Sequence, residues 1–150
     1  MTIREIADQL QMVGAQDRLD ILLDYAERLP PLPEAYAPLR DRGLNMVHEC
    51  QSPVFLMVEV DDDDVVHLHA DVPREAPTAR SFTSILLEAF DEQPASVVLD
   101  APPDVLHDLG IGALIGMQRT RGLRAIYAKL RNEVARKVGG NGGVGERESG

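Results

Sequence analysis

Hydrophobic side chains recur every three or four residues in four stretches of the chain, and this spacing predicts four amphipathic helices. The first helix follows Thr2, which forms a capping-box pattern with Glu5, and ends at Gly14. The second takes Asp17 as its cap and ends at the proline-rich segment 30–33, because proline cannot continue a helix. The hydrophobic positions of these two helices are Ile3, Ile6, Leu10 and Val13, then Leu19, Leu22, Leu23, Ala26 and Leu29.

The other two helical patterns lie in the second half of the chain. One spans residues 78–90, and the other runs from Thr120, its predicted cap, to Val138. Between them, residues 96–99 are rich in β-branched side chains but are too few to assign to a strand or to a helix. Segment 102–110 opens with two prolines and an aspartate, which predicts a single helical turn that ends near its final glycine.

The predicted strands lie in the middle of the chain. Residues 54–60 form one strand, the four aspartates at 61–64 form a turn, and residues 65–70 form a second strand, so the pair is a hairpin with an acidic tip. Residues 46–48 are a candidate third strand. The stretch before them, residues 34–45, contains a proline and a glycine and is expected to be an extended surface connection.

Together these elements predict one α+β domain, in which a small antiparallel sheet of about three strands packs against helices from both ends of the chain. The domain is expected to span residues 1–138. The remaining residues, 139–150, begin with Gly139-Gly140-Asn141-Gly142-Gly143 and contain too few apolar side chains to pack. We therefore expect them to form a disordered, glycine-rich tail.

Composition and charge narrow the classes of function. The chain has 150 residues and a single cysteine, Cys50, which excludes an internal disulfide and a metal or cluster site held by several cysteines. Its formal net charge of -10 argues against nucleic acid as a partner, because binding to phosphates relies on a basic surface. No apolar run approaches the roughly 18 residues that a membrane span needs. We therefore expect no membrane partner and a cytoplasmic location.

Cys50 is the first candidate for chemistry. It lies in the polar segment His48-Glu49-Cys50-Gln51-Ser52-Pro53, which is typical of an exposed connection between strands. A thiol in such a loop can act as a nucleophile, be oxidised or carry sulfur, whereas a lone cysteine inside a core is an inert small hydrophobe. From these residues alone, both interpretations stay open.

The histidines of the second strand are another candidate. His67-Leu68-His69-Ala70-Asp71 contains the His-x-His-x-Asp part of a metallohydrolase site, and strand alternation places both imidazoles on one face. The complete motif needs another histidine directly after the aspartate, where this chain has Val72. We therefore expect two histidines on the solvent-facing side of the sheet and no metal site. The aspartates at 61–64 lack the ligand spacing and the glycine of an EF-hand and predict a solvated turn.

Three sequence motifs, taken in their order along the chain, are more specific indicators of a protein family than any single residue. Residues 18–33 combine an amphipathic helix with a Leu-Pro segment, and Asn45-Met46-Val47-His48-Glu49-Cys50-Gln51-Ser52-Pro53-Val54-Phe55-Leu56 surrounds the cysteine. Near the other end stand Leu109-Gly110-Ile111, Ile115, Arg119 and Gly122-Leu123. Over roughly residues 5–136 the chain thus resembles the SufE family of sulfur-acceptor proteins. The usual cysteine signature of that family is Asn, any, Val or Ile, any, Gly, Cys, any, Ser, any, Val, Trp.

The chain departs from this family pattern at several positions. Glu49 stands where the family usually has glycine, and Phe55 stands where it usually has tryptophan. A carboxylate beside the thiol is expected to raise the pKa of Cys50, because like charges oppose formation of the thiolate. In the closing motif, Gly116-Met117 replaces the usual Ser or Thr and Pro, and Arg121 replaces an asparagine.

The resemblance implies a function in sulfur relay. In that family, a pyridoxal-phosphate cysteine desulfurase carries a persulfide on its own cysteine, and the acceptor takes the outer sulfur and hands it to an iron-sulfur scaffold. By this resemblance, Cys50 is the sulfur-accepting residue, while Arg119, Gln51 and Ser52 support its loop or contact the partner. The protein is then a sulfur carrier and an activator of a cysteine desulfurase rather than a stand-alone enzyme, and it holds no cofactor of its own.

Alternatives remain for both the function and one residue. A non-catalytic interaction protein of the same fold that has lost sulfur transfer is the main alternative, and Glu49 favours it. A metal-dependent hydrolase built on His67 and His69 is a weaker one, because its set of ligands is incomplete. For Arg119, the structural alternative is an ion pair with a carboxylate such as Asp108.

Overall fold

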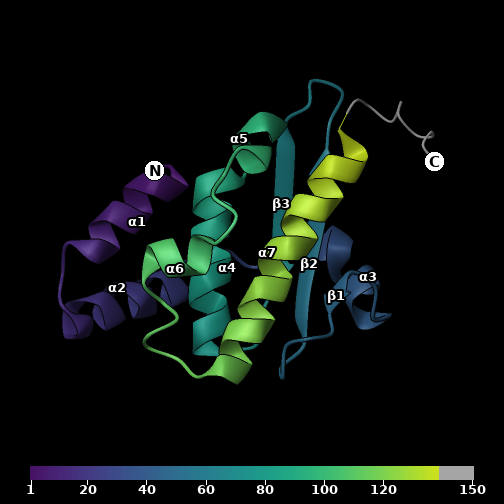
Figure 1. Ribbon diagram of the computed structural model, residues 1–150. Helices are drawn as coiled ribbons and strands as arrows, with labels where there is room; N and C mark the ends of the chain where they lie inside the picture. The colour runs from purple at the N-terminus through teal and green to yellow at the C-terminus, as the bar shows by residue number, and fades with distance from the viewer. Residues whose placement is uncertain (139–150) are drawn as a thin grey trace.

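The structure is a computed structural model and describes residues 1–138 of the chain (Figure 1). Within these residues, seven α-helices, one short 3-10 helix and three strands follow one another. In chain order they are α1 (Ile3–Gln11), α2 (Ala15–Arg28), η1 (Glu34–Tyr36), α3 (Ala37–Asp41), β1 (Met46–Val47), β2 (Val54–Val60), β3 (Val66–Asp71), α4 (Pro77–Phe90), α5 (Ala95–Leu99), α6 (Val105–Leu109) and α7 (Met117–Lys137). The tail predicted for residues 139–150 lies outside the described residues.

The strands form one antiparallel sheet in the order β1-β2-β3, which confirms the predicted α+β fold. In the hairpin of β2 and β3, Leu56 lies opposite Ala70 and Glu59 lies opposite His67. Because successive side chains point to opposite faces, one face carries aliphatic residues and the other carries both histidines. The buried positions of the aliphatic face are Val54, Leu56, Val58, Val66, Leu68 and Ala70.

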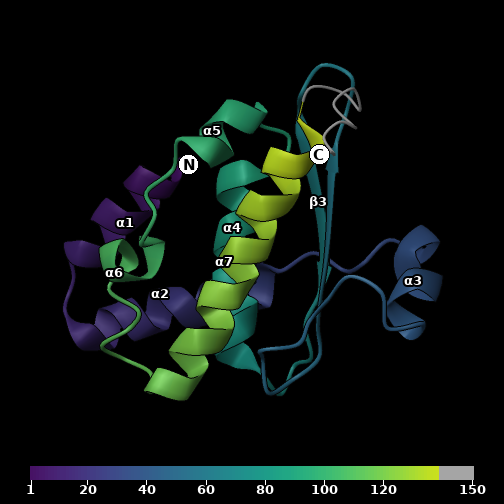
Figure 2. The ribbon, with the colours of Figure 1, turned by 45° about the vertical axis from the view of Figure 1, so that its right-hand side comes forward.

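Helices from both ends of the chain build the layers beside this sheet. Helices α4 and α7 pack against its aliphatic face, and α2 packs against α4 on the side away from the strands. Figure 2 shows the sheet nearly edge-on, with α4 and α7 on one side and α3 on the other. The core between the layers is almost free of polar side chains, and Phe82, Ile85, Ile126 and Leu130 are fully buried in it.

Two helices begin earlier than the sequence pattern predicted. Helix α2 begins at Ala15 rather than after Asp17, and α7 begins at Met117 rather than after Thr120. Each has a glycine as its N-cap and no side-chain hydrogen bond to its first turn. The Thr120 hydroxyl instead donates to the carbonyl of Gly116 at 3.0 Å, a bond within the helix rather than a cap.

The connection that was predicted to be extended, residues 34–45, contains the helical segments η1 and α3. Pro38 lies in the first turn of α3, where a missing N–H costs no helical hydrogen bond, so this proline does not oppose a helix. Two side chains attach the segment to the histidine-bearing face of the sheet. Tyr36 stacks on His69 with ring centroids 4.5 Å apart, and Arg40 forms an ion pair with Asp71 at 2.9 Å.

Residues 96–99, which local sequence could not assign, belong to helix α5. Arg131 of α7 donates to the carbonyl oxygens of Leu99 and Ala101 at 3.1 and 3.0 Å. This contact satisfies carbonyl groups that the end of a helix leaves unpaired, so α7 stabilises a helix here despite the β-branched side chains. The helical turn predicted within 102–110 is confirmed as α6.

Candidate functional site

Cys50 lies in the loop between β1 and β2, where the loop passes over the first turns of α7. The loop is exposed at His48, Glu49, Gln51 and Pro53, as predicted, but the thiol of Cys50 itself is half-buried. The Cys50 thiol donates a hydrogen bond to the main-chain carbonyl of Gly122, with Sγ and oxygen 3.5 Å apart. These residues are 72 positions apart in the sequence, so the folded arrangement of α7 decides the environment of the thiol.

A pocket of about 140 Å³ opens beside this thiol. Its walls are the loop at residues 50–52, the turn and helix start at 75–79, and the first two turns of α7. The four residues that were predicted to form the sulfur-transfer site all line this pocket, namely Cys50, Gln51, Ser52 and Arg119. The fold therefore brings Arg119 of α7 to the same pocket as the three consecutive loop residues 50–52.

The surroundings of Cys50 oppose its ionisation. Burial of the thiol is the larger cause and the nearby carboxylate of Glu49 is the smaller, and together they raise the pKa of Cys50 from 9.0 to about 11. The sequence predicted the effect of Glu49, but it did not predict burial. In the isolated protein at neutral pH, Cys50 is therefore a thiol and not a thiolate.

Arg119 is exposed at the rim of the pocket. Within residues 1–138 it forms no ion pair, so the predicted alternative of a pair with Asp108 is wrong for the described part of the chain. Asp108 instead uses its main-chain carbonyl to accept a hydrogen bond from Gln11 at 2.7 Å. The guanidinium of Arg119 thus has no carboxylate partner among the residues that the structure describes.

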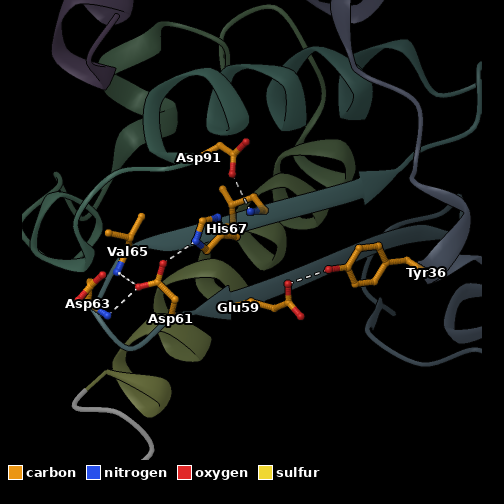
Figure 3. Close-up of polar contacts among 8 residues, drawn as sticks. Tyr36, Glu59, Asp61, Asp63, Val65, His67 and Asp91 are labelled. Atoms are coloured by element: carbon orange, nitrogen blue, oxygen red, sulfur yellow. Dashed lines mark hydrogen bonds and ion pairs between the residues drawn. The ribbon is translucent and has the colours of Figure 1, made fainter.

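The two histidines of β3 share one face, as strand alternation predicted, but each has a separate partner. His67 Nε2 lies 2.8 Å from a carboxylate oxygen of Asp61 (Figure 3), and His69 stacks on Tyr36. The Tyr36 hydroxyl also donates to Glu59 at 2.8 Å. Among residues 1–138, no three histidine, cysteine, aspartate or glutamate side chains gather closely enough to hold a metal ion.

Asp61 closes the acidic turn between β2 and β3. Its carboxylate accepts hydrogen bonds from the main-chain N–H groups of Asp63 and Val65, at 2.8 and 3.0 Å (Figure 3). The bond to His67 and these N–H groups lower the pKa of Asp61, and the same carboxylate raises the pKa of His67. This part of the aspartate run is therefore a structured turn.

The contact between Gly122 and Cys50 was not predicted from the sequence, where Gly122 stood out only as part of the closing motif. The available signal was a glycine inside a long helical pattern, because such a glycine weakens a helix and usually reflects a close packing contact. In the structure, that contact is the thiol loop.

The chain matches the family described as "SufE: Fe-S metabolism associated domain" over residues 4–134. SufE-like proteins from two strains of Mycobacterium tuberculosis, described as uncharacterized, are each 41% identical over 132 residues, which is 88% of this chain and 90% of the relative. The solution structure of a hypothetical protein from Thermus thermophilus has a TM-score of 0.76 and 30% identity, and covers 90% of this chain and 96% of that one.

The chain therefore belongs to the SufE family, as its motifs predicted. Membership associates the protein with iron-sulfur metabolism. Within residues 1–138, no helix is both long enough and apolar enough to cross a membrane.

Proposed function

We propose that the protein accepts sulfur on Cys50 from the persulfide of a cysteine desulfurase and passes it on to an iron-sulfur scaffold. The observation that carries this proposal is the position of the single cysteine, which lies in a pocket together with the other three nominated residues. Membership of the SufE family supports the assignment to iron-sulfur metabolism. A free thiol carrier needs a reducing compartment, so we place this function in the cytoplasm.

The transfer needs only one thiol on this chain. Cys50 loses its proton, and the resulting thiolate attacks the outer sulfur of the desulfurase persulfide. The S–S bond of the desulfurase breaks, its cysteine leaves as a thiolate, and a new S–S bond forms on Cys50. The sulfur keeps its oxidation state, so the step requires no external oxidant, no metal and no cofactor bound to this protein.

Arg119, Gln51 and Ser52 are the other residues of the proposed site. We assign Arg119 to contact with the desulfurase, because its guanidinium lies at the rim of the pocket and has no carboxylate partner within residues 1–138. Gln51 and Ser52 flank the thiol in the same loop and line the pocket, so we assign them to support of that loop.

The alternative is an interaction protein of the same fold that does not transfer sulfur. The raised pKa of Cys50 favours it, because a thiol with a pKa of about 11 is ionised in only about one molecule in 1,000 at pH 8. Burial and Glu49 both contribute to this low fraction. The two functions differ in whether Cys50 becomes loaded.

Loading is measured by incubating the protein with a bacterial cysteine desulfurase and cysteine, followed by mass spectrometry of the intact chain. We expect the wild-type protein to gain the mass of one sulfur atom, which a reducing agent removes, and to raise the rate at which the desulfurase releases alanine. The matched control is Cys50→Ser, which keeps the size of the side chain and should show neither effect. If the wild-type protein binds the desulfurase but gains no sulfur, the protein is instead an interaction protein that does not transfer sulfur.

A further inference from the structure

Cys50 packs closely against Gly122, so that a side chain at position 122 would crowd the thiol. A Cβ atom added to Gly122 would lie 3.1 Å from Sγ and 3.3 Å from Cα of Cys50. Real Cβ atoms rarely have such contacts, so either the thiol loop or helix α7 would have to move by a few tenths of an ångström. The absence of a side chain at residue 122 therefore lets the thiol sit at its observed position without crowding.

Helix α7 has no local reason to contain this glycine. Gly122 lies in its second turn, and glycine is the least favourable helical residue after proline. The neighbouring side chains Leu123 and Ile126 are buried in the core, so this part of α7 is firmly held. The loop around Cys50 has no such anchor of regular structure, and it is the partner that would give way.

The contact also has a chemical consequence. The S–H group of Cys50 donates to the carbonyl oxygen of Gly122, which carries partial negative charge. A thiolate has no hydrogen to donate and is repelled by the same oxygen, so the contact favours the neutral thiol. Burial and Glu49 act in the same direction on the same group.

We propose that Gly122 is a positioning residue that holds Cys50 inward as a neutral thiol and so protects it from small oxidants and alkylating reagents. This inference rests on the proposed function for its biological meaning, since a protected thiol reserves the reaction for a docked sulfur donor. The physical claim concerns only the free protein. It can therefore be tested without a desulfurase.

The test is the rate at which iodoacetamide alkylates Cys50, measured between pH 7 and pH 10.5. Because the chain has one cysteine, the reagent reports on this residue alone. We expect Gly122→Ala to press the thiol outward and to lower its pKa toward 9.0 by reducing its burial, while the effect of Glu49 remains, so the thiolate fraction at pH 8 rises by less than about 100-fold. The intrinsic nucleophilicity falls with the pKa, so the expected gain in rate is at most about tenfold.

The matched control is Gly112→Ala, where an added Cβ meets no atom within 4 Å. This variant should keep the wild-type rate and pH profile. If Gly122→Ala reacts no faster than the wild type and has the same pH profile, the proposed role of Gly122 is overturned. Loading by a desulfurase is a separate measurement, so a wild-type protein that fails to load refutes the proposed function without changing this result.

A second measurement covers the case in which Gly122→Ala folds but is too unstable for the alkylation assay. Gly122→Ala is also made in a Cys50→Ala background, where Sγ is absent, and urea unfolding is compared in the two backgrounds. We expect the substitution to be better tolerated without the sulfur, because the closest of the predicted contacts is gone. Equal effects of Gly122→Ala in both backgrounds would show that residue 122 does not press on the thiol and would overturn the proposal.

Discussion

Removing the charge of Glu49 with the substitution Glu49→Gln is expected to make Cys50 more reactive by up to about threefold. The reason is that the carboxylate of Glu49 is one of the two causes that raise the pKa of the thiol. Glutamine has nearly the same size as glutamate but no charge, so the substitution leaves the burial of Cys50 in place.

The magnitude follows from the order of the two causes. The pKa of Cys50 rises from 9.0 to about 11, and burial is the larger contribution. Glu49 then accounts for less than half of the rise, so the pKa in the variant stays above about 10 and the thiolate fraction at pH 8 increases by at most about tenfold. Since a less basic thiolate is a weaker nucleophile, the alkylation rate increases by at most about threefold.

The assay is again alkylation of the single cysteine, now at low and at high salt. Salt shortens the range of charge interactions, from about 10 Å at 0.1 M to about 3 Å at 1 M. Wild-type protein should therefore react faster at 1 M salt, and Glu49→Gln should lose most of this dependence. The control is Glu75→Gln. Glu75 also lines the pocket, but its carboxylate does not shift the pKa of Cys50. The reasoning is refuted if Glu49→Gln is alkylated no faster than the wild type. It is also refuted if Glu75→Gln increases the alkylation rate as much as Glu49→Gln does.

Two further predictions concern stability. Arg18→Met is expected to destabilise the fold by about 1–3 kcal/mol in urea unfolding, because three carbonyl groups lose a charged donor. The control is Arg121→Met, which lies at an exposed position and should leave the free energy of unfolding nearly unchanged. Those carbonyl groups belong to Leu10, Val13 and Gly110. His67→Gln should lower the thermal midpoint at pH 5.5 and have little effect at pH 8.5. Asp61 raises the pKa of His67, so the stabilisation is complete below the unfolded pKa near 6.5 and disappears as the pH rises through the folded pKa. A loss that is equal at both pH values would contradict this assignment.

Regular hydrophobic spacing was sufficient to predict the hairpin and the long helices. It failed where a distant residue decides the local structure. Residues 96–99 have a strand-like composition, yet Arg131 binds the carbonyl groups at the end of α5, about 30 residues away in the sequence. The starts of α2 and α7 were misplaced for a different reason: a glycine caps each helix without a side-chain hydrogen bond, whereas the prediction chose the nearby side-chain caps Asp17 and Thr120.

The functional site was likewise predictable only in part. The polar segment around Cys50 left its role open, and only the resemblance to the SufE family singled out Cys50 and Arg119 as site residues. The residues alone correctly predicted the direction in which Glu49 shifts the pKa of the thiol. Burial of the thiol and its bond to Gly122 could not be predicted, because both depend on the packing of α7 against a loop 72 residues earlier. A glycine inside a helical pattern indicates a close contact, but it does not indicate with what.

The two causes of the raised pKa respond differently to a docked partner. Docking of a desulfurase over the pocket removes more water from Cys50, so it strengthens the effect of burial and cannot by itself promote the thiolate. A positive charge or a hydrogen-bond donor placed close to Sγ acts in the required direction, because either one stabilises the thiolate. Arg119 lies at the rim of the pocket but does not lower the pKa of Cys50 in the free protein, and the chain as a whole has a net charge of -10. On the proposed function, the surface of the desulfurase that meets this loop therefore has to supply positive charge or hydrogen-bond donors that offset Glu49 and stabilise the thiolate.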